Sequence, residues 1–220
     1  MRFIYRLGTY LIGIMVLTFG NALTFNSNLG ASAITALTFA MNQVTGITLG
    51  LMSFIMFTSY VLLQAILLKK DFKPIQYLQI LFAVLFGQFL QVFNSLLQIE
   101  INNLMIRFLM VIAGITCVAI GIFLTVTPRL VPLAPDGMTQ AVSIKAKIDF
   151  GKAKNFVDIT CVTLAITLLL LTGNNLNAVG IGTVLSAIFV GRILYLLNRY
   201  LKSSIEKVLF PQEECIEEDL

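Results

Sequence analysis

Long, uninterrupted apolar stretches dominate this chain and alternate with short polar segments. A helix needs about 20 residues to cross the hydrocarbon layer of a bilayer, and six stretches approach that length. They predict membrane-spanning helices over residues 7–25, 49–68, 75–97, 108–126, 156–171 and 179–197. The expected fold class is therefore an all-α membrane protein with six transmembrane helices.

The composition supports this interpretation and narrows the chemistry. Of the residues, 58% are hydrophobic and only 12% are charged, whereas soluble domains carry about 25% charged residues. The sequence contains no histidine and no tryptophan, and its three cysteines are scattered. Histidine is the commonest metal ligand and general base, so we expect no metal site, no cofactor and no enzymatic activity.

The basic residues are distributed asymmetrically between the loops. All of the fifteen lysines and arginines except Arg107 lie before the first span, between the second and third, between the fourth and fifth, or at the end of the sixth. Positive residues favour the cytoplasmic side of a membrane. We therefore expect both termini in the cytoplasm. The net charge of +4 is a topology signal, and no nucleic-acid partner is expected.

The chain also contains an internal repeat. Residues 13–50 align without a gap on residues 114–151, and eleven of the 38 pairs are identical, whereas chance would give roughly three. Glycine pairs in register are the most informative: Gly13 with Gly114, Gly20 with Gly121, and Gly50 with Gly151. Such matching indicates the duplication of an ancestral unit. Glycines in or beside the spans are also expected to allow close helix contact: Gly13, Gly20, Gly114, Gly121, Gly180, Gly182 and Gly191.

Three spans separate each unit from its copy, so the second copy must enter the membrane from the opposite face. The prediction is two inverted three-helix repeats, residues 1–100 and 101–208, followed by a disordered acidic cytoplasmic tail at 209–220. Many secondary transporters share this arrangement, with the binding site between the halves. A duplicated scaffold that transports nothing is the alternative.

A short helix is predicted after the first span of each repeat. Residues 28–45 and 129–146 each look like a turn followed by about three helical turns, too short to span and therefore re-entrant or interfacial. Thr35 and Asp136 are at equivalent positions, and both residue types cap helix N-termini. If both helices dip into the membrane, their N-termini could converge on an anionic or carbonyl-bearing ligand. Otherwise these are ordinary caps.

Four short motifs resemble the YitT/YczE-like family of bacterial integral membrane proteins. They are NLGAS at 28–32, GITLG at 46–50, PDGM at 135–138 and VGIGTVLSAIFVG at 179–191. Departures occur where the family has proline and aspartate, here Ala33 and Thr35, and where it has arginine and proline, here Pro135 and Arg192. The resemblance covers about 200 residues and implies a multi-span protein of the bacterial cell membrane whose function is uncharacterised and related to transport, with no substrate named.

Polar residues within the spans need an explanation, since a charge at the bilayer centre costs about 2.5–3.5 kcal/mol. Asp158 in the fifth span and Arg192 in the sixth are predicted to form a structural ion pair. In the third span Gln88, Gln91 and Asn94 are spaced by three and share one helix face. That face is expected to turn inward, either to bind a neighbouring helix or to line a site.

The leading hypothesis is a transporter or permease for a small solute or anion, working in the lipid bilayer. Two alternatives stay open: a substrate-capturing membrane subunit that works with a separate ATPase module, and a non-transporting scaffold or regulator, for which a homodimer is one form. The substrate-binding residues selected by the leading hypothesis are Asn21, Ser32, Thr35, Gln88, Gln91, Asn94, Asp136, Gly137 and Thr139.

Overall fold

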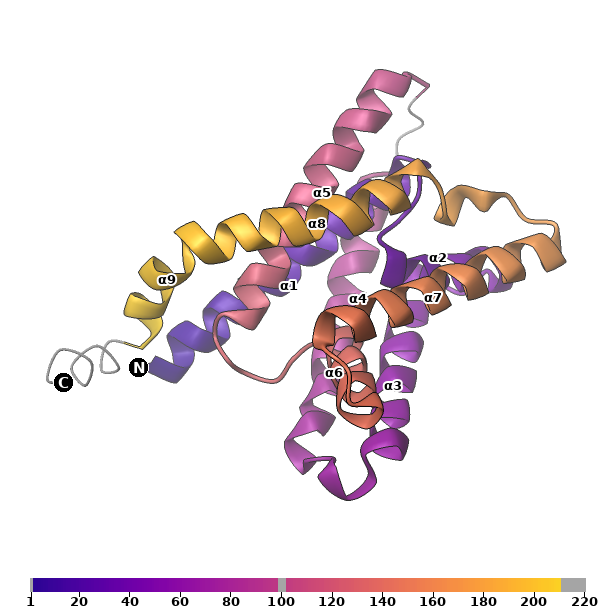
Figure 1. Ribbon diagram of the computed structural model, residues 1–220. Coiled ribbons are helices and arrows are strands. Elements are labelled where there is room, and N and C mark those ends of the chain that lie inside the picture. Colours follow the sequence, from indigo (N-terminus) through magenta and orange to yellow (C-terminus); the bar gives the residue numbers. More distant parts are fainter. Residues whose placement is uncertain (1, 99–101, 211–220) are drawn as a thin grey trace, which may run out of the picture.

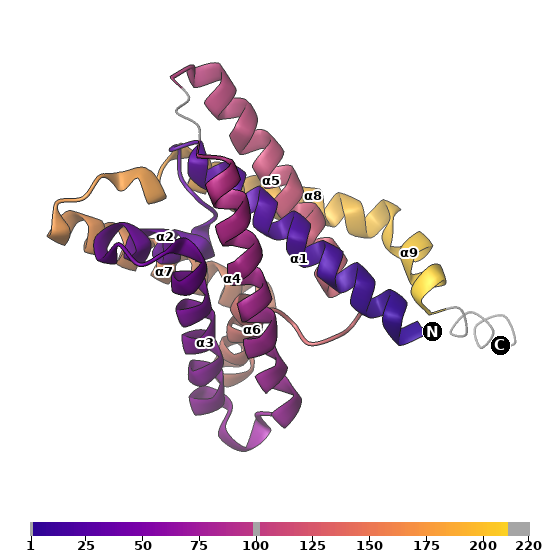
Figure 2. The same ribbon diagram turned by 180° about the vertical axis from the view of Figure 1, so that it is seen from behind.

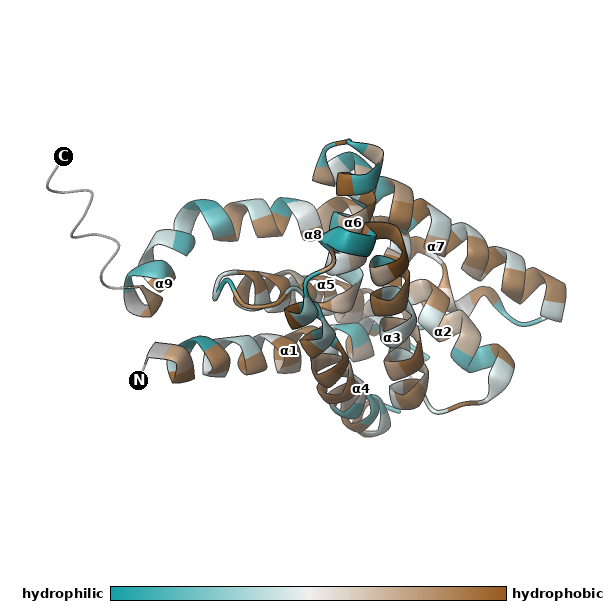
Figure 3. Ribbon diagram, turned by 90° about the horizontal axis from the view of Figure 1, so that it is seen from below, coloured by the Kyte–Doolittle hydropathy of each residue, from teal (hydrophilic) through white to brown (hydrophobic). Residues whose placement is uncertain are grey.

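The computed structural model describes residues 2–98 and 102–210, and within these ranges every regular element is a helix. Six of the helices are long and apolar enough to cross a membrane, which indicates a multi-pass membrane protein. Their hydrophobic residues run along most of each helix, as Figure 3 shows by colour. The six are α1 (Arg2–Asn26), α3 (Leu49–Leu68), α4 (Leu78–Leu96), α5 (Leu104–Val126), α7 (Phe150–Thr172) and α8 (Ile181–Tyr200).

Shorter helices connect them. The two predicted short helices are present as α2 (Ala33–Thr45) and α6 (Ala134–Ala146), with 13 residues each. Both end on a residue in the left-handed conformation, Gly46 at φ 70° and Lys147 at φ 55°. The remaining elements are η1 (Lys69–Asp71), η2 (Pro74–Tyr77), η3 (Leu176–Ala178) and α9 (Lys202–Leu209).

The fifth span is longer than its apolar stretch predicts. The expected helix covered 156–171, but α7 begins at Phe150. No proline or backbone break interrupts the polar first turns, and Lys152 and Lys154 are good helix formers. The acidic tail was predicted to begin at residue 209, but Leu209 is the last residue of α9. Residues 211–220 lie outside the described part of the chain.

Helices α1 and α5 pack along each other at the centre of the molecule (Figures 1 and 2). Their approach depends on glycine. A methyl group on Gly20 would lie 2.7 Å from the carbonyl oxygen of Gly114, and one on Gly121 would lie 2.5 Å from the backbone nitrogen of Leu17. Helix α4 packs against α1, and α8 packs against α5. The predicted role of these glycines in close helix contact is confirmed.

Two arginines that are 101 positions apart make matching contacts. The Arg6 Nε donates to the carbonyl oxygen of Pro128 at 2.9 Å, and the Arg107 Nε donates to that of Ser27 at 2.6 Å. Each Nη2 donates to the next carbonyl oxygen, of Arg129 and Asn28 respectively. Each arginine therefore satisfies carbonyl groups beyond the end of the other central helix, where no helical partner remains.

Replacing either arginine by glutamine should destabilise the protein to a similar extent. Hydrogen bonds from a charged donor are worth about 1.5–3 kcal/mol when buried, and partial exposure of both side chains reduces the expected loss to about 1 kcal/mol. Thermal unfolding of the purified chain in detergent measures this. Arg199→Gln, at an exposed site on α8, is the matched control and should leave the midpoint unchanged. Unequal losses for Arg6→Gln and Arg107→Gln would contradict the equivalence.

The correspondence between positions 101 apart does not extend to the packing of α3 on α4 and of α7 on α8. Helices α3 and α4 pack tightly, because a methyl group on Gly50 would lie 2.5 Å from the carbonyl oxygen of Gly87. At the position equivalent to Gly50, a methyl group on Gly151 meets nothing within 4 Å. Gly191 is similarly open, so the close helix contact expected of it is wrong. The space between α7 and α8 forms a cavity instead.

Candidate functional site

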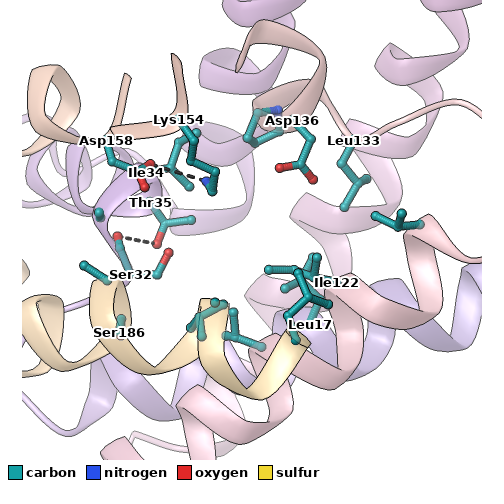
Figure 4. Close-up of a pocket in the computed structure, with 18 of the residues that line it drawn as sticks. Leu17, Ser32, Ile34, Thr35, Ile122, Leu133, Asp136, Lys154, Asp158 and Ser186 are labelled. Atoms are coloured by element: carbon teal, nitrogen blue, oxygen red, sulfur yellow. Dashed lines mark hydrogen bonds and ion pairs between the residues drawn. The ribbon is translucent and has the colours of Figure 1, made fainter. Parts of the chain in front are cut away.

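A cavity of about 630 Å³ lies between α7 and α8, against the central helices. This volume is within the range of about 300–1,000 Å³ that is typical of small-molecule sites. The first residues of α2 and α6 also line it, as do side chains of α3 and α4. Figure 4 shows polar groups of α2, α6 and α7 facing apolar side chains of α1 and α5, among them Leu17 and Ile122.

The N-termini of both short helices reach this cavity. The α2 end contributes Ser32, Ala33, Ile34 and Thr35, and the α6 end contributes Pro132, Leu133, Pro135, Asp136 and Gln140. Thr35 and Asp136 are not the caps, contrary to expectation, because the cap positions fall at Ser32 and Leu133. Pro135 suits the first helical turn, since the amide that it lacks would have no helical partner there. Thr35 and Asp136 are therefore the third residues of their helices and lie within the first turn.

Three charged side chains lie on the cavity wall formed by α6 and α7. The Lys154 Nζ donates to the Asp158 Oδ1 at 3.4 Å along α7. Asp136 extends from α6 towards the same cavity (Figure 4), and its carboxylate accepts no side-chain hydrogen bond from the described residues. Burial raises the pKa of Asp136, and the nearby Lys154 ammonium partly opposes this effect. With both carboxylates ionised this wall carries one net negative charge.

On the α2 wall the polar groups are neutral. The Thr35 hydroxyl donates to the Asn21 Oδ1 at 3.3 Å and to the carbonyl oxygen of Ser32 at 3.1 Å. Ser186 of α8 is 3% exposed, and its Oγ has no hydrogen-bond partner among the described residues. Ser186 lines the cavity together with Ser32. The unused hydroxyl is an available donor or acceptor at this wall.

The far end of α8 is attached to the turn before α2. The backbone N–H of Gly182 donates to the carbonyl oxygen of Leu29 at 2.7 Å, and that of Ala31 donates to Ala178 at 3.1 Å. Gly30 adopts φ 113°, and a methyl group there would lie 2.6 Å from the Gly180 nitrogen. Glycine is therefore required at this contact. The contact joins the turn before α2 to the N-terminal end of α8, one helical turn before Ser186.

Helix α6 is held in place by two buried amide side chains. Gln64 of α3 and Gln79 of α4 exchange hydrogen bonds at 3.0 and 3.1 Å, and the Gln64 Nε2 also donates to the carbonyl oxygen of Ala134. Both glutamines are fully buried. A methyl group on Gly137 would lie 2.6 Å from the Gln64 Oε1. Gly137 therefore allows the start of α6, and with it Asp136, to approach this amide pair.

The glutamine pair should behave as a single unit in mutagenesis. Gln64→Leu or Gln79→Leu alone leaves a buried amide without its partner and should cost about 2 kcal/mol of unfolding free energy. The double replacement removes both amides and should cost much less than the sum of the two losses. Thermal or denaturant unfolding in detergent of all four proteins measures the coupling. Additive losses would contradict a reciprocal pair.

Residues 4–199 match the model of DUF6198, which is described as a family of unknown function. The chain belongs to this family. No curated protein and no solved structure matches it. The DUF6198 description does not name the YitT/YczE-like proteins, so that resemblance stays a prediction.

The DUF6198 chain brings part of the predicted site together. Asn21, Ser32, Thr35 and Asp136 all line the cavity. Gly137 lies beside Asp136 against the glutamine pair, and the Thr139 hydroxyl is fully buried and donates to the carbonyl oxygen of Pro135. The last two residues shape α6 and do not line the cavity.

The three amides of α4 lie away from the cavity. The Gln91 Oε1 accepts the backbone N–H of Gly50 at 3.0 Å, and the Asn94 Oδ1 accepts a hydrogen bond from Asn26 at 2.9 Å. Gln88 is exposed beside a smaller pocket. Gln91 and Asn94 therefore hydrogen-bond to neighbouring helices, which is the alternative expected for the amides on this face.

The predicted Asp158–Arg192 pair is not among the ion pairs of the described residues. Asp158 is paired with Lys154, one turn earlier on α7. Arg192 is exposed, and its guanidinium lies 5.7 Å from the centre of the Phe189 ring. The cavity separates α7 from α8 at this level, because Asp158 and Gly191 both line it.

Four polar residues at or beside the cavity were not predicted from the sequence. Lys154 precedes Asp158 by four residues, a spacing that indicates a helical ion pair, but the fifth span was predicted to begin after it. Gln64 and Gln79 are amides in apolar stretches, as noticeable as those of the third span. Ser186 gives no signal, since only the fold places its hydroxyl beside the cavity.

Proposed function

We propose that this DUF6198 protein is a secondary transporter of a small organic solute, built from two inverted three-helix repeats. The cavity carries this proposal. It has the volume of a small-molecule site, combines an apolar lining with a few polar groups, and is lined by the first turns of both short helices. A scaffold would be expected to fill its centre with side chains.

Matching contacts support the inverted arrangement. The paired hydrogen bonds of Arg6 and Arg107 join positions 101 apart. The Asn42 side chain donates to the carbonyl oxygen of Ile47, and the Ser143 hydroxyl donates to that of Ile148, the corresponding residue. Helix α2 packs on α7 as α6 packs on α3. These reciprocal relations are what a pseudo-twofold axis between α1 and α5 would generate, with α2 and α6 as re-entrant helices.

The broken symmetry supports a transport cycle. In inverted-repeat carriers the two halves take different conformations and exchange them to expose the site to each side in turn. Here α3 is closed on α4 while α7 is apart from α8. The cavity extends to Phe150 at the start of α7 and to Leu194 on α8, ends that the positive-inside rule assigns to the cytoplasm. We take this as the inward-open state, sealed outside by the Gly30–Gly180 contact.

Cross-linking α7 to α8 tests this proposal without knowledge of the substrate. Gly151→Cys and Gly191→Cys face open space across the cavity. They are introduced after Cys117, Cys161 and Cys215 are replaced by alanine, and joined by a bismaleimide. Proteoliposomes are loaded with a pool of organic acids, amines, amino acids and sugars, and efflux is followed by mass spectrometry. We expect accelerated efflux of one solute class before cross-linking and its arrest afterwards.

The singly substituted Gly151→Cys protein, treated with the same reagent, is the matched control and should retain its efflux. If no solute leaves faster than from protein-free vesicles, or if the cross-link changes nothing, the transporter proposal fails. An associated ATPase and a homodimer stay predictions from sequence alone.

A further inference from the structure

The two helix N-termini at the cavity differ in charge. Both carry the partial positive charge of a helix N-terminus. Helix α6 places Asp136 in its first turn, whereas α2 has no acidic residue there and carries neutral Thr35 at the equivalent position. When ionised, Asp136 carries a full negative charge that exceeds the partial positive charge of the α6 N-terminus. The α2 N-terminus has no such side chain and keeps its positive potential. The cavity is polarised between these two walls.

The α2 end presents hydrogen-bond groups that the protein does not use. The backbone N–H groups of Ala33 and Ile34 have no acceptor among the described residues, and the Ser32 side chain does not cap the helix. Ser186 adds an independent observation: its hydroxyl is 3% exposed and lacks a described partner. It follows Gly182, which touches the turn before α2, by one helical turn, and Figure 4 shows it beside Ser32. This wall is suited to a carboxylate.

The opposite wall is suited to a cation. The Asp136 carboxylate accepts no side-chain hydrogen bond from the described residues. The Lys154 ammonium group lies 3.4 Å from the Asp158 Oδ1 and also acts electrostatically on Asp136, so the two carboxylates share one positive charge. One more positive charge would neutralise the wall. An ammonium group on a ligand can supply both that charge and the missing donors.

Apolar side chains lie between the two polar walls. Phe57 and Phe86 are in contact, with ring centres 4.5 Å apart, and both line the cavity. Leu17, Val118 and Ile122 of the central helices complete this part of the lining. A ligand that spans the cavity therefore needs a hydrophobic body as well as two charged ends.

We propose that the solute is a zwitterion with an apolar body, of the amino-acid class. Its carboxylate binds at the α2 N-terminus with the hydroxyls of Ser32 and Ser186, and its ammonium binds Asp136. This assignment rests on the proposed transport function and names the substrate class of the same cavity.

Matched ligands test the assignment by direct binding to the purified full chain in detergent. The probes are L-leucine with 3-methylbutylamine and 4-methylpentanoate, and L-phenylalanine with phenethylamine and 3-phenylpropanoate. Each set keeps the apolar body and removes one charge. At least one amino acid should bind at least about tenfold more tightly than both of its analogues, measured by calorimetry or by the shift of the unfolding temperature.

Substitutions should separate the two walls. Thr35→Asp places on α2 the charge that α6 already has, and should weaken amino-acid binding at least about tenfold relative to the isosteric Thr35→Asn. Binding of the amine should not weaken. Asp136→Asn should weaken the amino acid and the amine but spare the acid.

The outcomes distinguish this assignment from the transport proposal. Binding of the acids as tight as that of the amino acids, insensitive to Asp136→Asn, would overturn the zwitterion assignment and point to an anion carrier. Binding of none of the six probes would also overturn it. In either case the efflux and cross-linking experiment decides separately whether the protein transports.

Discussion

Gly121→Ala should disrupt the packing of α5 against α1 and strongly destabilise the protein. The added methyl group would lie 2.5 and 2.6 Å from backbone atoms of Leu17, which cannot move away as the end of a flexible side chain can. Helices α1 and α5 would have to separate along their contact, and overpacking of this kind costs about 3 kcal/mol or more. The expected result is a large fall in the unfolding midpoint in detergent, or failure to accumulate folded protein.

Two further alanine substitutions make this prediction specific. Gly20 is the equivalent residue of α1, and a methyl group there would lie 2.7 Å from the carbonyl oxygen of Gly114, so Gly20→Ala should cost a similar amount. Gly8 also lies in α1 but has nothing within 4 Å, so Gly8→Ala should be neutral or stabilising by about 0.5–1 kcal/mol. Equal midpoints for all three variants would mean that the central contact does not limit stability.

Asp136→Asn should strongly reduce transport while making the protein more stable at neutral pH. Truncating one charge of a buried pair with a ligand costs about 2 kcal/mol or more in binding, which corresponds to a flux roughly thirtyfold lower at limiting solute. A substitution that only damaged the fold would lower flux and stability together. Opposite changes in the two measurements therefore identify a residue whose charge serves function at the expense of stability.

The stability gain should depend on pH. Because burial raises the pKa of Asp136, ionising this carboxyl group costs more free energy in the folded protein than in the unfolded chain. The contribution of this group to stability is therefore fully present below the ordinary carboxyl pKa and is lost as the pH rises through the raised pKa. The groups that interact with it are Lys154 and Asp158 of α7 and Tyr10 of α1.

Unfolding midpoints of the wild type and Asp136→Asn are measured from pH 4 to pH 8. The two curves should coincide at the acidic end and separate as the pH rises, with the wild type becoming the less stable. Asp149→Asn, at an exposed position before α7, is the matched control and should follow the wild type in both stability and flux. Parallel curves for Asp136→Asn and wild type would contradict a buried, ionising carboxylate.

Much of the architecture could be predicted from local patterns. Apolar length alone defined six spans, because a bilayer imposes one length on every helix that crosses it. The repeat also predicted two equivalent short helices, and α2 and α6 begin and end at positions 101 apart. Glycines such as Gly20 and Gly121 indicated close helix contact, since their missing side chains matter only where backbones meet.

The site was harder to predict, because pairing in space does not follow from residue type. Asp158 and Arg192 are opposite charges in adjacent spans, yet Lys154 on the same helix lies nearer to Asp158. The amides of α4 share a sequence pattern with a binding face, but Gln91 and Asn94 are used by neighbouring helices.

By itself, the sequence determined how many helices are long and apolar enough to cross a membrane and which two stretches match at an offset of 101, because these depend on hydrophobic length and local identity. Only the tertiary structure decided where the cavity lies. It is open between α7 and α8 and closed at the equivalent Gly50–Gly87 contact. Two copies of one sequence pattern take different packing there, because burial and helix approach depend on the neighbours that the whole fold supplies.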